Sequence, residues 1–131
     1  MFRRPAGHPN PERARIDEER LTRRTMHDTL AFIVKNVQME VTDIRDEIYT
    51  PESMMRKIIE RVGANPRLAG CQADADLLYS RLSELQALIA KVDGESTEAM
   101  ARTVVAARWK QHEITDAHTQ YMFIVQALLR R

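Results

Sequence analysis

Three acidic side chains on one predicted helical face are the first residues whose spacing could support chemistry. Glu40, Asp43 and Glu47 follow one another at helical spacing, so they share one side of a helix. Carboxylates placed in this way could hold Mg²⁺ or Mn²⁺. A complete site would need further acids from a second helix, and the chain offers only scattered ones there. We therefore favour a solvated acidic face, and we predict no cofactor and no metal ligand.

A second possible ligand pair is formed by His112 and Asp116, one turn after Trp109. Their spacing of one helical turn suits two metal ligands. No Glu-x-x-His pair, no second histidine-rich helix and no Cys-x-x-Cys accompanies them, so we favour a hydrogen-bonded surface pair. The chain also has no glycine-rich phosphate loop. No motif predicts an enzyme.

Two polar residues, Gln111 and His118, interrupt an apolar heptad seam near the end of the chain. We favour their acting as polar layers that fix helix register or as residues at a wet rim; the alternative is that His118 is a ligand or a pH switch.

Cys71 is the single cysteine and cannot form an internal disulfide. It starts an apolar stripe, which predicts a buried structural thiol.

Length and composition predict one all-α domain. The 131 residues are long enough for a core, 44% of them are hydrophobic, and glycine, proline and aromatic residues are few. The net charge of +1 makes no general electrostatic case for nucleic acid. No stretch reads as a signal peptide or a membrane span, so we expect a cytoplasmic protein without membrane contact. The excess of arginine over lysine favours a bacterial or phage source.

The positions that begin and end helices divide the chain into an arm and four helices. Asn-Pro-Glu, Thr-Pro-Glu and Ser-Thr-Glu sequences mark helix starts, and glycines mark two of the ends. Between the second and third helices, Ala64–Gly70 is predicted to be a linker. The fold is then an antiparallel bundle of three long helices and one short helix behind a flexible basic arm. The predicted ranges are 1–10 for the arm and 11–49, 51–62, 72–93 and 96–130 for the helices.

The last helix is predicted to reach beyond its neighbour. A three-residue connection makes residues 72–93 and 96–130 an antiparallel hairpin, and their lengths are roughly 33 Å and roughly 51 Å. The surplus is the most apolar segment of the chain, which must be covered by the rest of the bundle or by a second chain. We therefore predict a non-enzymatic helical interaction protein (an adaptor, chaperone, regulator or assembly factor) that self-associates through this helix. The predicted partner-binding residues are Tyr121, Met122, Phe123, Ile124, Val125, Leu128 and Leu129.

Two other functions are alternatives to the interaction protein. The first 24 residues hold seven arginines and four acids, so positive charge gathers at one end and could bind nucleic acid. The third possibility is a metal-dependent bundle enzyme that uses the carboxylates or the histidine described above. The residues predicted for nucleic-acid contact are Arg3, Arg4, Arg13, Arg15, Arg20, Arg23 and Arg24.

Overall fold

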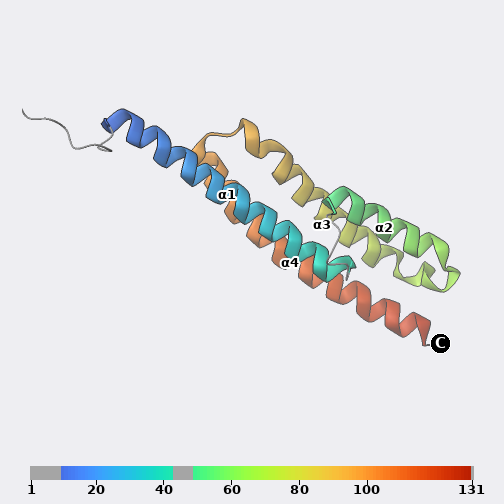
Figure 1. Cartoon of the computed structure of the whole chain (residues 1–131). Helices are drawn as coiled ribbons and strands as arrows, with labels where there is room; N and C mark the ends of the chain where they lie inside the picture. Colours follow the sequence, from blue (N-terminus) through green and yellow to red (C-terminus); the bar gives the residue numbers. More distant parts are fainter. Residues whose placement is uncertain (1–9, 43–48, 131) are drawn as a thin grey trace, which may run out of the picture.

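The computed structural model describes residues 10–42 and 49–130, and these residues form a helical bundle with no strand among them (Figure 1). The all-α prediction is confirmed. Short 3₁₀ helices follow the second and third α-helices. The elements are α1 (Pro11–Thr42), α2 (Pro51–Ala64), η1 (Pro66–Cys71), α3 (Gln72–Lys91), η2 (Val92–Gly94) and α4 (Thr97–Leu129).

Side-chain caps fix the start of three helices where the sequence predicted them. Asn10 Oδ1 accepts from the backbone N–H of Arg13 at 2.7 Å, before α1. Thr50 and Ser96 accept in the same way before α2 and α4, each at 3.2 Å. Each cap satisfies a backbone N–H that has no partner within its helix.

The predicted helix 11–49 is too long at its end. Tyr49 is not helical, and residues 43–48, like 1–9 of the predicted arm, lie outside the described residues. Proline disfavours helical backbone at the residue before it, and Thr50 is extended as the cap before Pro51. The backbone N–H of Tyr49 instead donates to Gln38 Oε1 at 2.8 Å.

The predicted linker is largely helical as well. Asn65 Oδ1 accepts from the N–H of Arg67 at 3.0 Å, and its carbonyl accepts from Leu68 at 2.9 Å, which starts the 3₁₀ turn η1. The residue type that indicated a turn therefore also caps a short helix. Element η1 lies directly before α3 and carries the buried Leu68 and Cys71.

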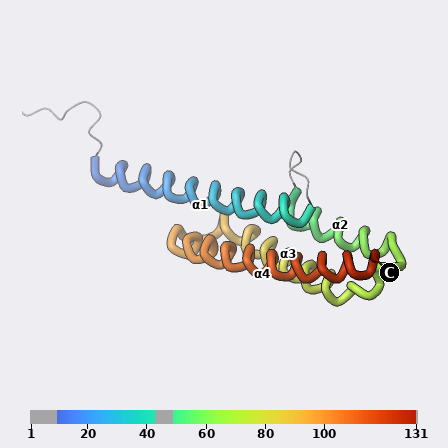
Figure 2. The backbone as a smooth tube through the Cα atoms, turned by 90° about the horizontal axis from the view of Figure 1, so that it is seen from below, coloured from blue at the N-terminus to red at the C-terminus, as the bar shows by residue number. Residues whose placement is uncertain are grey.

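The core is built on one face of α4. Helix α3 runs antiparallel to α4 as predicted, and α1 runs in the same direction as α4 (Figures 1 and 2). Both pack on α4, whereas α1 and α3 make few direct contacts with each other. The buried residues that line these contacts are Met100, Ala107, Ile114, Tyr121 and Val125 of α4, Leu78, Leu82 and Leu85 of α3, and Leu30, Ile33 and Val37 of α1.

Polar contacts fix the register of α1 along α4. Near the start of α4, Arg23 donates from Nη1 to the carbonyl of Glu95 at 3.0 Å. Further along, Glu40 Oε2 accepts from Thr115 Oγ1 at 3.0 Å. The front of α1 extends past the other helices (Figure 2).

The apolar end of α4 is largely covered by its own chain. Element η1 lies against it so closely that a Cβ atom at Gly70 would stand 3.2 Å from Leu128 Cδ2. Tyr121 and Val125 are buried there, Leu68 of η1 belongs to the same core cluster, and η1 contacts α4. The predicted linker therefore covers part of α4 that α3 does not reach.

This contact gives the first testable prediction. Replacing Leu68 by alanine should lower the free energy of unfolding by about 2–5 kcal/mol, because it removes buried methyl groups and leaves a cavity under α4. The matched control is Leu21→Ala, at an exposed position of α1, which should change it by less than about 0.5 kcal/mol. Urea denaturation measures both. Equal small effects would show that η1 does not cover the end of α4.

Candidate functional site

The seven residues predicted to bind a partner do not form one exposed surface. Tyr121 and Val125 belong to the core, and Met122, Ile124 and Leu128 are half-buried against it. Phe123 and Leu129 remain exposed, at 68% and 41%. The chain thus covers most of this segment itself, and Phe123 lies on the outer side of α4.

An apolar groove lies between α1 and α3 instead. Its volume is about 480 Å³, and it opens to solvent between these two helices, which make few direct contacts with each other. Because α1, α3 and α4 occupy three corners of a bundle here, the groove takes the place of a fourth helix. The apolar residues that line it are Leu30, Ala31, Val34, Ile89 and Val92.

The groove exists because α2 begins late. Helix α2 packs on α3 and has 14 residues, so it fills the fourth corner only beyond Pro51. Tyr49 is held just before it by the hydrogen bond to Gln38 and by Lys57, whose Nζ lies 5.0 Å from the centre of the Tyr49 ring. Tyr49, Thr50 and Pro51 close one end of the groove.

Polar groups stand at defined places in this groove. Gln86 Oε1 is buried in the lining and accepts no hydrogen bond from the described residues. A buried acceptor without a donor costs about 1–3 kcal/mol. At the opposite end from Pro51, His27 Nε2 lies 3.5 Å from Asp93 Oδ1.

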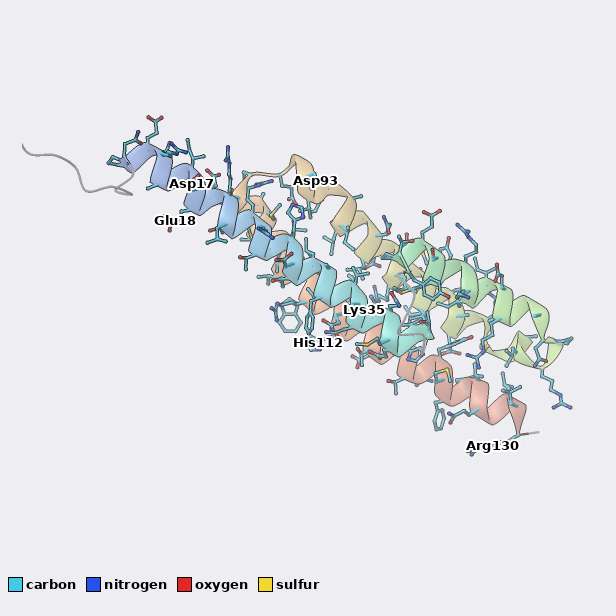
Figure 3. All side chains as sticks on the ribbon, in the orientation of Figure 1. Asp17, Glu18, Lys35, Asp93, His112 and Arg130 are labelled. Atoms are coloured by element: carbon cyan, nitrogen blue, oxygen red, sulfur yellow. The ribbon has the colours of Figure 1, made fainter. Side chains whose placement is uncertain are left out.

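The arginines of α1 divide between this face and others. Arg13, Arg20 and Arg24 are exposed at i, i+7 and i+11, which places them on the same side of α1 as His27 and Ala31. A basic strip therefore continues the groove along the projecting front of α1. Figure 3 shows Asp17 on the same part of α1.

Arg15 and Arg23 do not belong to this strip. Arg15 is exposed on another side of α1, and Arg23 is occupied with the start of α4, donating also to Thr97 Oγ1 at 3.4 Å. Arg3 and Arg4 lie outside the described residues. The structure thus groups three of the seven arginines on one face, beside the groove.

The predicted carboxylate face is engaged within the bundle as far as it is described. Glu40 accepts from Thr115, and its Oε1 lies 3.8 Å from His118 Nδ1, whereas Asp43 and Glu47 lie outside the described residues. Elsewhere His112 contacts the ring of Trp109 edge to face, at 6.1 Å between centroids. No group of three His, Cys, Asp or Glu side chains in the described part of the chain could hold a metal ion.

Burial dominates the titration of three interior side chains. Burial raises the pKa of the Cys71 thiol, and the nearby Asp74 carboxylate raises it further. Its Sγ donates to the carbonyl of Leu68 at 3.0 Å, so Cys71 is the predicted buried thiol. Burial likewise raises the pKa of Tyr121, and it lowers the pKa of His118, where Glu40 opposes the shift. None of these groups is poised for nucleophilic chemistry.

A cluster of ion pairs joins α3 to α4 on the surface. Lys110 binds both Glu84 and Glu113, and Arg81 Nη1 lies 3.1 Å from Glu84 Oε1. The hydrogen bond from Lys110 lowers the pKa of Glu84. These contacts link the two helices of the hairpin and leave no charge of the cluster unpaired.

Comparison with known proteins adds no relative: no family model, no curated protein and no solved structure matches this chain. Within the described residues, every helix is too short or too polar to cross a membrane.

The second prediction concerns His118. Because its pKa is lower in the folded protein than in the unfolded chain, the unfolded chain binds a proton more readily around pH 6.5. Stability contributed by neutral His118 is therefore complete above that pH and is lost as the pH falls through it. His118→Gln should reduce the drop in unfolding free energy between pH 7.5 and 5.5, measured by urea denaturation. An unchanged drop would show that other groups cause it.

Proposed function

We propose that this protein is a non-enzymatic helical interaction protein, an adaptor, chaperone, regulator or assembly factor, that binds a partner helix in the groove between α1 and α3. The observation that carries this proposal is the unfilled fourth corner of the bundle. Its volume is about 480 Å³, and most of its exposed lining surface is apolar, with His27, Lys35, Gln38, Thr50, Gln86 and Asp93 contributing polar groups. An amphipathic helix laid in such a groove buries its apolar face.

The charges around the groove indicate the partner's chemistry. Arg20 and Arg24 stand on the groove side of α1, so a helix that continues past His27 would place its flank beside guanidinium groups. Carboxylates on that flank would be attracted, and lysines repelled. We therefore propose an acidic amphipathic helix as the occupant.

The cytoplasm is the proposed location, and a protein is the proposed partner. The single cysteine is buried and free, which fits a compartment where thiols stay reduced. The nucleic-acid alternative retains one supporting feature, the exposed strip formed by Arg13, Arg20 and Arg24. It requires no apolar groove, and this difference separates the two proposals.

The third prediction tests the groove directly. The probe is a fluorescein-labelled 18-residue helical peptide with leucines along one face and glutamates beside them. Binding to this protein, measured by fluorescence anisotropy, should be lost or weakened at least tenfold in Ala31→Arg, because the new side chain occupies the groove from an exposed position. Ala90→Arg, at an exposed position of α3 outside the groove lining, is the control and should bind normally.

The fourth prediction separates a helix from nucleic acid. The same peptide with lysines in place of glutamates should bind at least tenfold more weakly, because it meets the basic strip of α1. Duplex DNA of random sequence, assayed by gel shift, should bind weakly and equally in wild type and Ala31→Arg. DNA binding that exceeds peptide binding, falls steeply with salt and is lost in Arg20→Glu/Arg24→Glu would favour the nucleic-acid alternative.

A further inference from the structure

The outer face of α4 carries an ordered set of residues that no described part of the chain covers. Val105, Trp109 and Phe123 are exposed at 55%, 68% and 68%. His112 and Asp116 are exposed between them, and Figure 3 shows His112 projecting from the side of α4 opposite α3. Large exposed apolar residues grouped on one helix face mark an interaction site.

Two copies of this helix face would be complementary to each other if the helices lay antiparallel. If a second α4 lies antiparallel with the two-fold axis level with Ile114, each residue faces the one equally far on the other side of that level. Val105 then faces Phe123 of the second copy, and His112 faces Asp116. An apolar pair and a pair of imidazole and carboxylate therefore occur in both halves of the contact, while Trp109 falls opposite Thr119.

We propose that two copies of this chain associate through the outer faces of their α4 helices, antiparallel about a two-fold axis at Ile114. Along each α4 helix, the interface between the positions of Val105 and Phe123 is roughly 27 Å long. Beyond it, the exposed Glu98 would face Arg130 of the second copy, a further pair of opposite charges. Trp109 adds a large aromatic side chain to the apolar part of the interface.

The parallel arrangement is disfavoured by the same residues. Two α4 helices in parallel register would place Glu98, Asp116 and Arg130 each against the same residue of the second copy, so like charges would meet at three levels of the interface. The antiparallel arrangement removes these repulsions. The charge order along this face therefore selects one orientation of the second copy.

This interface goes beyond the proposed binding of a partner helix and is independent of it. The groove is lined by α1 and α3 and by no residue of α4, whereas Trp109, at the edge of the outer face, lines a separate pocket with Glu84 and Leu88 of α3. Figure 3 places Asp93, at one end of the groove, and His112 at opposite edges of the molecule. Failure of one proposal therefore leaves the other standing.

The test uses two charge variants of the whole chain. In His112→Asp two carboxylates meet in the homodimer, and in Asp116→Lys a lysine meets a histidine. Each variant alone should raise the dimer dissociation constant at least tenfold, measured by sedimentation equilibrium. An equimolar mixture should recover the dimer, because each contact then joins an aspartate to a lysine or a histidine. Leu77→Asp, at an exposed position of α3, should leave the dimer unchanged.

A cross-linking experiment fixes the orientation. A mixture of Val105→Cys and Phe123→Cys should form disulfide-linked dimers under mild oxidation, whereas neither variant alone should do so, since Cys71 is buried. Cross-linking of either variant with itself would indicate parallel helices and overturn the proposal. So would a wild-type chain that stays monomeric at 100 µM, or a mixture of charge variants that remains monomeric while wild type dimerises.

Discussion

One apolar strip along α4 holds the whole structure together. It runs from Met100 to Val125, and α1, α3 and η1 all pack against it. Its buried residues recur at the 3.5-residue average of a heptad seam, which keeps them on one side of a helix of 33 residues. Isolated helices gain little stability from propensity alone. The other elements are therefore stable mainly through this shared surface, and each is positioned by where it meets α4.

The groove follows from the way the chain fills the fourth corner of the bundle. Helix α2 spans roughly 21 Å, whereas α4 spans roughly 50 Å. A single short helix cannot cover both ends, and the capped start at Thr50 directs α2 toward the C-terminal end of α4 (Figure 1). At the other end, α1 and α3 are both attached to α4 but are left apart. The position of α2 near the buried Tyr121 therefore leaves the groove open near His27 and Asp93.

Local signals in the sequence predicted most of the fold. The helices could be predicted from their caps and their heptad seams, because both patterns involve residues that are close in sequence. The caps are Asn10, Thr50 and Ser96. The helical state of Pro66–Cys71 was missed because Asn-Pro signals a turn and a capped 3₁₀ helix equally well. The predicted end of the first helix at residue 49 was wrong. Helical periodicity in the sequence continues to that position, but the backbone N–H of Tyr49 donates to Gln38 Oε1. That contact is tertiary and leaves no pattern in the sequence.

The candidate sites were harder to predict for a related reason. The apolar density of Tyr121–Leu129 indicated a contact, yet density alone does not say whether the same chain supplies it. The groove exists because α1 and α3 make few contacts with each other. The sequence of either helix alone does not indicate how closely the two pack. The signal for the outer face of α4 was present: Val105, Trp109 and Phe123 interrupt its polar side at helical spacing.

The two proposed surfaces would act together without touching. In the two-fold dimer the α4 helices lie at the centre, and each copy's α1 and α3 face outward, so both grooves stay accessible. The two grooves would point in opposite directions along the dimer, because the α4 helices are antiparallel. A partner that carries two suitable helices on a linker of sufficient span would bind with an effective concentration set by that linker. Dimerisation would then raise apparent affinity for paired or assembled partners over single ones, a selectivity that neither surface provides alone.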